Sequence, residues 1–519
     1  MRLDELRGFT RLILELPRFL RGRIDGRQAR RMVGDMTARR AERFLAKLRS
    51  AVFDNPASPY GTLCRWAGCE FGDVEKLVAT DGVEGALEAM RRAGIYVQWE
   101  ELKGRSPIVR GSKSLDAPWA AYNNPVSRSY AEARSGGSSG RPATTTVDLA
   151  NDVEAAPDWA ILFDAHGWLD QPLLFWTPGH VGVVSRFLKC SRFGKDMERW
   201  FVMARMTTGG DRLRAAIVHG YARWCAGYPP PEPAPLGDAG RVLDYLYRRL
   251  DEGARPVMNT SPSAAALLAR LAGERGRELT GVSFLLGAEP VTHARFATIE
   301  ASGARAIATY GTSEGGWIGA QFPGAEEPDE VLIFREAYAV LPNPRLPGDG
   351  PSQPLLFTNL RSAAPKVLLN AELGDSGVLQ PGRRSPWSEE FGYDLRLHTI
   401  RSLRKVTVWG STFAVSDLDL LLEQVLPRRF GGSHADYQLI EEQDSAGTPI
   451  LRLIVDPQAG AIDERELRTV FVAGLSRLKS SYGFMAQEVM DMDGLRIERA
   501  PPRVSASGKV LSVVTHRAA

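Results

Sequence analysis

Three short, mostly apolar runs between residues 257 and 314 each lead into a segment with helix signals. The runs cover residues 257–260, 282–286 and 304–310, and each is followed by a proline, a glycine or small polar residues. Short apolar runs that alternate with helices are typical of parallel strands in a βα arrangement. We therefore expect a mainly parallel sheet flanked by helices, with a ligand site at the carboxyl ends of its strands.

With 519 residues, the chain is too long for a single core and should hold two or more domains. The fold class expected is α/β, with a large N-terminal domain over residues 1–402 that starts with a helical segment. A small, mobile α+β domain is expected over residues 403–519. Strand and helix signals alternate in that second part, at residues 405–409, 415–425, 450–455, 464–478 and 496–499.

The composition is that of an ordinary globular protein, with 44% apolar and 24% charged residues. A formal net charge of +3 is too small to indicate a nucleic-acid partner. The four cysteines have neither zinc-ligand nor disulfide-framework spacing, which indicates reduced thiols in a cytoplasmic protein. No apolar run approaches the roughly 20 residues of a membrane helix, so no transmembrane segment is expected. The sequence does not determine the oligomeric state, and a homodimer is one option.

The beginning of the chain is basic and reads as helix. Residues 1–50 carry 14 Lys and Arg against 6 Asp and Glu, and residues 3–53 have apolar side chains at helical spacing. A basic amphipathic helix can lie on a membrane surface. Packing on the protein's own core is the favoured interpretation, because Pro17 and Gly22 interrupt the pattern. Residues 71–95 continue with helix signals.

A run of small and hydroxylated residues, Ser-Gly-Gly-Ser-Ser-Gly-Arg-Pro, occupies positions 135–142. Glycines let backbone N–H groups turn toward an anion, hydroxyls add donors and Arg141 adds charge, so the run suits a polyphosphate. It is not a Walker A loop, because Pro142 follows the cation and residues 144–146 read as a strand. Taken alone, the run fits a solvated linker as well.

More motifs follow in order along the chain. They are Gly287-Ala288-Glu289-Pro290, Tyr310-Gly311-Thr312-Ser313-Glu314, Gly374-Asp375, the stretch at 400–410 and Ser505-Ala506-Ser507-Gly508-Lys509-Val510. Together with the loop at 134–142, this series resembles the core motifs of the adenylate-forming superfamily, which includes acyl-CoA synthetases, luciferases and peptide-synthetase adenylation domains. The Gly-Ala-Glu-Pro form and the loop are most similar to the phenylacetate-CoA ligase and acyl-protein synthetase branch. One motif would mean little, whereas five in family order carry weight.

The resemblance implies an ATP-dependent ligase that activates a carboxylic acid as an acyl adenylate and releases pyrophosphate. In-line attack on the α-phosphate requires the protein to position ions and to neutralise spreading negative charge. The implied cofactors are ATP and Mg²⁺, and the first choice of acyl acceptor is coenzyme A.

Other acceptors and another class of protein stay open. A carrier-protein thiol, an enzyme cysteine or an amine would also accept the acyl group, and AMP activation of an oxyanion such as nitrite is a further alternative. A non-catalytic nucleotide-binding scaffold is the alternative from a different class. Lys509, Glu314 and Asp375 are all retained, which argues against the scaffold.

By the same resemblance, three residues are implied as catalytic. Lys509 would bridge the attacking carboxylate and the α-phosphate, Thr312 would contact the α-phosphate, and Glu314 would bind Mg²⁺, a hard cation that prefers carboxylate oxygen. The family usually has lysine at the position of Arg141, and a guanidinium can replace it with two hydrogen bonds. The β- and γ-phosphates would be held by Ser135, Gly137, Ser138, Ser139, Gly140 and Arg141.

The nucleoside is implied to lie near the other motifs. Tyr310 would stack near the adenine, Asp375 would accept hydrogen bonds from the ribose hydroxyls, and Arg401 would lie close to the ribose and phosphate. Arg404 stands where the family has its hinge residue, generally Asp or Lys. The remaining implied contacts to ATP or AMP are Gly287, Ala288, Glu289, Gly311 and Ser313.

The acid-binding residues are the least defined. His166 would follow an expected strand at 158–163, and residues 183–203 read as a helix. A lone histidine and buried aromatic residues are more often structural. The weaker candidates for the acid pocket are His166, Trp176, Gly315, Gly316 and Trp317.

Overall fold

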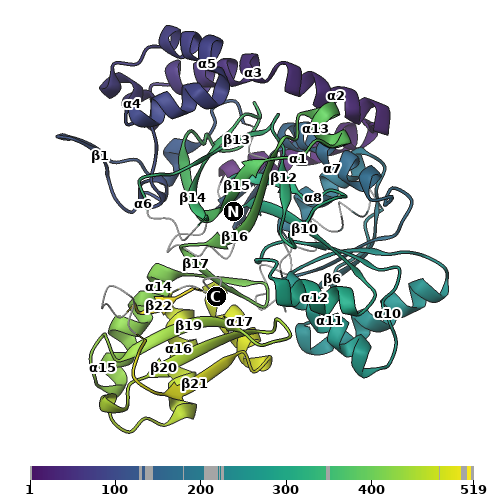
Figure 1. Cartoon of the computed structure of the whole chain (residues 1–519), viewed down its shortest axis with the longest axis vertical. Coiled ribbons are helices and arrows are strands. Elements are labelled where there is room, and N and C mark those ends of the chain that lie inside the picture. Colours follow the sequence, from purple (N-terminus) through teal and green to yellow (C-terminus); the bar gives the residue numbers. More distant parts are fainter. Residues whose placement is uncertain are drawn as a thin grey trace.

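The computed structural model describes residues 3–127, 131–134, 144–178, 181–203, 220, 223, 227–346, 351–478, 480–503 and 511–515. Figure 1 shows two parts, a larger one that contains the purple to green elements and a smaller one of green and yellow C-terminal elements. This arrangement confirms the expected large N-terminal domain and small C-terminal domain of an α/β protein.

Within the described residues, a twelve-stranded sheet runs through the larger part. Its parallel half contains the three strands predicted between residues 257 and 312, and its other half is antiparallel. The sheet is therefore mixed. In spatial order its strands are β13 (Tyr338–Pro342), β14 (Gln353–Asn359), β15 (Ala371–Pro381), β16 (Leu395–Ser402), β12 (Val331–Ile333), β11 (Gly316–Ala320), β10 (Arg305–Thr312), β9 (Ser283–Leu286), β8 (Val257–Thr260), β5 (Leu173–Thr177), β6 (Met197–Val202) and β7 (Glu232–Pro233).

Helices cover both faces of the parallel half. Phe175 of β5 packs on Phe187 of one helix at 4.9 Å between ring centroids, and Phe201 of β6 packs on Tyr245 of another helix at 5.7 Å. Phe175 and Phe201 lie at alternating positions in the register, so the two helices lie on opposite faces. The first face carries α7 (Leu149–Ala165) and α8 (Val181–Arg192), and the second carries α10 (Ala239–Asp251), α11 (Pro262–Glu274) and α12 (His293–Ala301).

Two sequence expectations in this region are wrong. Residues 158–163 form the last part of α7 and not a strand. The Asp148 carboxylate caps this helix by accepting from the Ala150 and Asn151 N–H groups at 2.8 and 3.2 Å. Because this part of α7 is buried on every side, its apolar run cannot be told from a buried strand by periodicity. The helix expected over 183–203 ends at Arg192, and β6 follows it.

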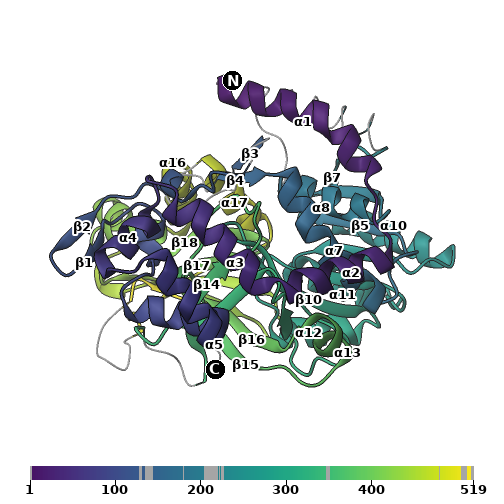
Figure 2. The ribbon, with the colours of Figure 1, turned by 90° about the horizontal axis from the view of Figure 1, so that it is seen from above.

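The N-terminal segment is helical, as predicted. Capping by Asp25 and Gln28 starts a new helix after the break at Gly22. Figure 2 shows the first helix extending from the body, and its second half packs on α8, where Arg192 donates to the Phe19 carbonyl at 2.8 Å. The helices are α1 (Leu3–Arg21), α2 (Gly26–Ala38), α3 (Arg40–Leu48), α4 (Pro59–Ala67), α5 (Phe71–Arg92) and α6 (Trp99–Leu102). None of the helices in the described residues is long and apolar enough to span a bilayer.

The smaller part begins with a hairpin, β17 (Lys405–Val408) and β18 (Ser411–Ala414), and contains a four-stranded sheet. The predicted strands and helices of this part are confirmed. The sheet order is β21 (Leu495–Arg499), β20 (Pro449–Val455), β19 (Tyr437–Gln443) and β22 (Val513–Val514), and its helices include α14 (Val415–Leu420), α16 (Glu464–Leu478) and α17 (Ser480–Asp491).

The two parts contact each other through the turn between β19 and β20. This turn lies against α12, where the Thr292 hydroxyl donates to Gln443 at 2.6 Å and the Thr298 hydroxyl donates to the Ala446 carbonyl at 2.8 Å. Arg295 also donates to the Gly447 carbonyl at 3.0 Å. These directed contacts hold the smaller part at the edge of the sheet where the parallel strands end.

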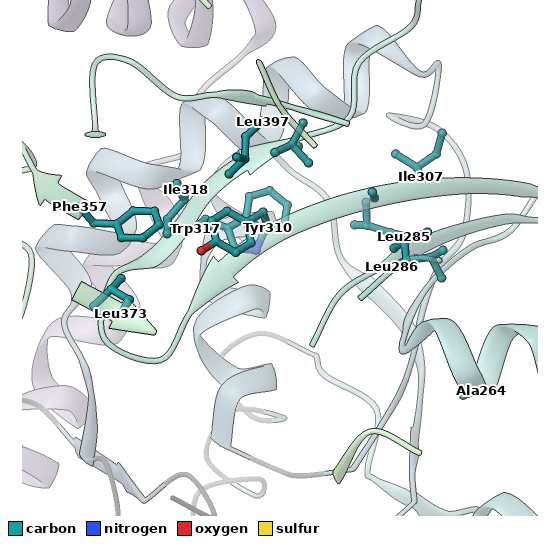
Figure 3. Close-up of a cluster of buried hydrophobic side chains, with 14 of the residues drawn as sticks. Ala264, Leu285, Leu286, Ile307, Tyr310, Trp317, Ile318, Phe357, Leu373 and Leu397 are labelled. Atoms are coloured by element: carbon teal, nitrogen blue, oxygen red, sulfur yellow. The ribbon is translucent and has the colours of Figure 1, made fainter. Parts of the chain in front are cut away.

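The core is continuous across the middle of the sheet. In the view of Figure 3, Tyr310 of β10 and Trp317 of β11 overlap between Leu285 of β9 and Phe357 of β14, and all four belong to one cluster of buried side chains. The parallel and antiparallel halves therefore share one core, which fixes the end of β10 relative to β15 and β16.

Candidate functional site

The site is built at the end of β10, where its tyrosine reaches across to β15. The Tyr310 hydroxyl donates to the Asp375 carboxylate at 2.9 Å, although 65 residues separate the two in sequence. Both side chains are buried. Burial raises the pKa of Asp375, and Lys405 offsets part of that rise. The structure thus brings together two of the residues predicted for the nucleoside.

Glu314 lies just beyond β10 in an ion pair with Lys103. The two side chains are only 2% and 6% exposed, respectively. Burial would raise the pKa of Glu314, but the positive charges of Lys103 and Lys405 outweigh it and lower that pKa to about 2. The carboxylate is therefore ionised throughout the physiological pH range.

Two indole rings enclose the Lys103 ammonium. Its nitrogen lies 4.4 Å from the ring centroid of Trp99 and 4.6 Å from that of Trp119, within cation–π range. Lys405 lies 5.0 Å from the Trp99 ring on the side of the smaller part. The N-terminal region therefore supplies one wall of the site. Sequence reasoning missed Lys103, Trp99 and Trp119 because they lie in no motif, and it gave no role to Lys405 within the 400–410 stretch.

One oxygen of Glu314, Oε2, is buried and has no hydrogen-bond partner in the part of the chain that the structure describes. Among the described residues, no group of three or more His, Cys, Asp or Glu side chains lies close enough to hold a metal. A single carboxylate oxygen suits Mg²⁺ that arrives with a polyphosphate, since this ion commonly takes one or two protein carboxylates plus phosphate oxygens and water. The residues present fit that ion and do not form a closed metal cage.

The Gly374 backbone allows Arg404 to pack closely behind Asp375. Gly374 has φ +79°, and a Cβ there would lie 3.0 Å from Cγ of Arg404, so glycine is needed at this position. Arg401, on β16 opposite Ser376 of β15, pairs with Asp329 at 3.2 Å. Arg401 is thus one register position away from Asp375 and on the opposite face of the two strands, and its predicted contact with the ribose and phosphate stays a prediction.

The 287–289 turn contacts the smaller part of the chain. Ala288 has φ +71°, a left-handed conformation that non-glycine residues seldom adopt. The Glu289 carboxylate is fully engaged: it accepts from the Ser263 hydroxyl at 2.7 Å, pairs with Arg295 at 3.0 Å and accepts from the Gly410 N–H of the β17–β18 turn. This side chain joins the two parts of the chain, and the predicted contact of residues 287–289 with ATP or AMP stays a prediction.

The acid-pocket candidates separate into two groups. Trp317 stacks on Trp159 of α7 with centroids 3.2 Å apart, and the Tyr338 hydroxyl donates to the Gly315 carbonyl. These contacts fix Gly315, Gly316 and Trp317 directly after Glu314. The site therefore continues from β10 into the β11 segment.

His166 and Trp176 are core residues and not part of this group. His166 bonds to the Gln321 carbonyl at 2.9 Å and lies 3.2 Å from a nitrogen of Arg305, at the beginning of β10. Burial lowers its pKa to about 4, so it is neutral at physiological pH. The Trp176 indole donates to the Ala234 carbonyl at 2.8 Å and is fully buried.

The predicted phosphate loop and the predicted catalytic lysine fall outside the described residues. The strands on either side of the loop segment, β3 (Ala131–Arg134) and β4 (Thr144–Val147), pair antiparallel. Beside the lysine segment, the carbonyls of Arg503 and Leu511 both accept from the Gln438 amide of β19, at 3.0 and 2.8 Å. The residues in these two segments are Ser135, Gly137, Ser138, Ser139, Gly140, Arg141 and Lys509.

No protein-family model matches the chain, and no curated protein matches it. Solved structures do. A 2-hydroxyisobutyryl-CoA ligase in complex with 2-HIB-AMP and CoA is 15% identical, with a TM-score of 0.56 over 93% of this chain and 90% of that one. An amide bond synthetase from Marinactinospora thermotolerans is 14% identical over 93% and 97%, with a TM-score of 0.41. An acyl-CoA synthetase from Brucella canis is 14% identical over 88% and 85%, with a TM-score of 0.34. At these identities the likeness establishes the fold.

Proposed function

We propose that this chain, which has the fold of the adenylate-forming ligases, activates a carboxylic acid with ATP to form an acyl adenylate and pyrophosphate. The observation that carries the proposal is the convergence of Tyr310, Asp375 and Glu314 beside the cations Lys103 and Lys405. A buried cluster with both signs of charge at the carboxyl ends of strands suits a nucleotide with a reacting phosphate.

Each residue has a chemical role in this proposal. Asp375 accepts hydrogen bonds from the ribose hydroxyls, and Tyr310 holds that carboxylate and offers its ring to the adenine. Thr312 contacts the α-phosphate, while Lys103 and Lys405 neutralise negative charge that spreads over the phosphate during attack. Glu314 Oε2 would hold Mg²⁺, and the ion would supply charge neutralisation on the triphosphate.

We further propose that the domain boundary lies at residues 402–403 and that the smaller part turns about it, near Arg404. The support is geometric. Arg503 and Leu511, on either side of the Lys509 segment, accept hydrogen bonds from Gln438 of β19. Gln443, at the other end of the same strand, bonds to Thr292 of the larger part. Gln438 and Gln443 are five residues apart on β19, which corresponds to roughly 17 Å of extended strand. In this proposal, a rotation of the smaller part brings Lys509 to the α-phosphate.

Transfer of the acyl group to coenzyme A is the first choice for the second step. The support is the 2-hydroxyisobutyryl-CoA ligase fold and the resemblance of the motifs to CoA ligases. A carrier-protein thiol or an amine remains the alternative, and mass spectrometry of the products with each acceptor separates them. Coenzyme A, ATP and the acid are the partners that the proposal requires.

Asp375→Asn is expected to weaken ATP binding roughly tenfold or more, because an amide accepts from the ribose hydroxyls with less charge than a carboxylate. Titration calorimetry with ATP measures this loss. Tyr310→Phe is the matched control, since it removes the hydroxyl that bonds Asp375 but keeps both the ring and the carboxylate. Equal ATP affinities for wild type and Asp375→Asn would rule out the ribose contact.

Lys103→Met is expected to move the acidic limb of the pH–rate profile to higher pH. Lys103 holds the pKa of Glu314 near 2, and without this charge the buried carboxylate takes up a proton at a higher pH. Pyrophosphate release measured between pH 5 and 8 reports the limb, and Lys103→Arg is the charge-retaining control. An unchanged limb in Lys103→Met would show that Lys103 does not act through Glu314.

The proposal is tested by incubating the protein with ATP, Mg²⁺ and a panel of carboxylic acids, and measuring both pyrophosphate and acyl adenylate. We expect both products in equal amounts with at least one acid, and neither with Glu314→Gln. ATP binding without pyrophosphate from any acid would instead support a nucleotide-binding scaffold.

A further inference from the structure

One arginine on a helix that covers the parallel half of the sheet has no carboxylate partner among the described residues. Arg186 of α8 is half-buried, and its Nη1 donates to the Asn259 side-chain oxygen of β8 at 2.5 Å. Within the described residues no carboxylate forms an ion pair with it, and burial lowers the pKa of its guanidinium. The side-chain NH₂ group of Asn259 donates to the Leu285 carbonyl at 3.3 Å, and this bond fixes the orientation of the amide.

The two fully buried arginines described in the larger part are paired with carboxylates, whereas Arg192, half-buried like Arg186, bonds to the Phe19 carbonyl. Arg295 pairs with Glu289 at 3.0 Å, and Arg361 pairs with both Asp158 and Glu336. A desolvated charge without a counterion costs free energy, and proteins usually supply the counterion or a ligand that replaces it. A guanidinium has five N–H donors, and the amide of Asn259 accepts from only one nitrogen here. Among the described residues, Arg186 therefore keeps donors that could bind an anionic ligand.

The strand register places Arg186 on the α7 and α8 face of the sheet. Phe175, which packs on α8, is aligned with Asn259, and Asn259 is aligned with Leu285. Aligned residues of neighbouring strands share a face. Asn259 and its bonded Arg186 thus lie on this face, near the carboxyl ends of the strands.

The nucleoside residues lie on the opposite face. Ile307 is aligned with Leu285, so Ile307 and Thr309 of β10 share the face of Asn259, and Tyr310 points the other way toward Asp375. Arg186 therefore lies on the other face of the sheet from Tyr310 and Asp375, the residues assigned to the nucleoside. The stacked pair Trp159 and Trp317 lies where α7 meets β11, and it provides apolar surface at the same end of the sheet.

We infer that Arg186, oriented by Asn259, binds an anionic group at the far end of the acid substrate, so that the substrate is a dicarboxylic acid or an acid with an equivalent second anion. This inference rests on the proposed adenylation function. One carboxylate of such an acid attacks the α-phosphate, while the other pairs with the Arg186 guanidinium. A carboxylate matches the planar fork of arginine with two parallel hydrogen bonds.

The test compares straight-chain dicarboxylic acids of four to eight carbons with monocarboxylic acids of the same length, using acid-dependent pyrophosphate release. For the preferred length, the wild type should favour the diacid in kcat/KM by on the order of a hundredfold, because a site built for a charge rejects the analogue that lacks it. Arg186→Gln should remove that preference. Arg186→Glu should favour the matching ω-amino acid, which guards against a variant that merely loses activity.

Arg192→Gln is the matched control on the same helix, since Arg192 donates to the Phe19 carbonyl at the other end of α8. It should keep the wild-type preference. A wild type that favours monoacids, or an Arg186→Gln variant with the wild-type ratio, would overturn the inference and leave adenylation intact. Failure to release pyrophosphate with every acid, while ATP still binds, would contradict the proposed function itself.

Discussion

Lys509→Ala is expected to slow acyl-adenylate formation by on the order of a hundredfold or more, while the protein stays folded. Loss of one preorganised charge-stabilising donor typically has an effect of this size. The lysine neutralises charge that develops as the acid attacks the α-phosphate, and no other residue of the small-domain motif carries that charge. The effect should appear in kcat and not only in KM, because the interaction is strongest in the transition state.

Single-turnover pyrophosphate release measures the adenylation step, and acyl transfer from supplied acyl adenylate measures the second step separately. The variant should lose the first and retain the second. Arg496→Ala, which removes an exposed cation from the same domain, is the control and should leave both rates unchanged. Wild-type pyrophosphate release by Lys509→Ala would refute the role of the lysine.

Arg361→Met is expected to lower the free energy of unfolding by about 3–5 kcal/mol at neutral pH, since it leaves the buried Asp158 carboxylate without its counterion. Arg361 pairs with Asp158 of α7 and lies 3.4 Å from Glu336. Tyr393 donates to the same aspartate at 2.9 Å but carries no charge. The cluster ties α7 to the antiparallel half of the sheet.

The loss should depend on pH. Burial and the neighbouring Asp158 raise the pKa of Glu336 to about 8 even with Arg361 present. A carboxyl whose pKa is higher when folded costs stability as pH rises above its unfolded value, and this cost is absent at lower pH. Urea unfolding at pH 5 and pH 8 should therefore show a smaller deficit at pH 5.

Arg335→Met is the control for this cluster, because Arg335 pairs with the partly exposed Glu84 at 3.2 Å and Asp394 at 3.5 Å. It should cost less than about 1 kcal/mol. A deficit of that small size in Arg361→Met, equal at both pH values, would show that the two carboxylates are stabilised by other means.

The parallel strands were predictable because the signal is local. Each run from β8 to β10 is short, apolar and closed by a turn or capping residue, and Ser261 followed by Pro262 marks the start of α11. The order of the antiparallel strands was not predictable, because β12 pairs with β16 across more than sixty intervening residues. Such pairing depends on the packing of the whole sheet and leaves no short-range pattern.

The residues of the candidate site likewise fall into those that a sequence motif predicts and those that only the three-dimensional structure brings there. Asp375 and Glu314 stand in motifs, so the sequence identified them before their contacts were known. Lys103 and Trp99 reach the site only because the backbone around residue 97 bonds to Asn370 and Glu372 at the start of β15. The sequence did not indicate Arg186 as a site residue either, since an arginine on an amphipathic helix is ordinarily exposed. Its lack of a counterion is visible only in three dimensions.

The most direct measurement is exchange of labelled pyrophosphate into ATP, with the acid present and every acyl acceptor left out. Reversible formation of an acyl adenylate predicts exchange that requires both the acid and Mg²⁺, and that falls at least about a hundredfold in Lys509→Ala. Saturating nucleotide binding without any exchange, across diacids and monoacids alike, would contradict the adenylation chemistry proposed for this fold.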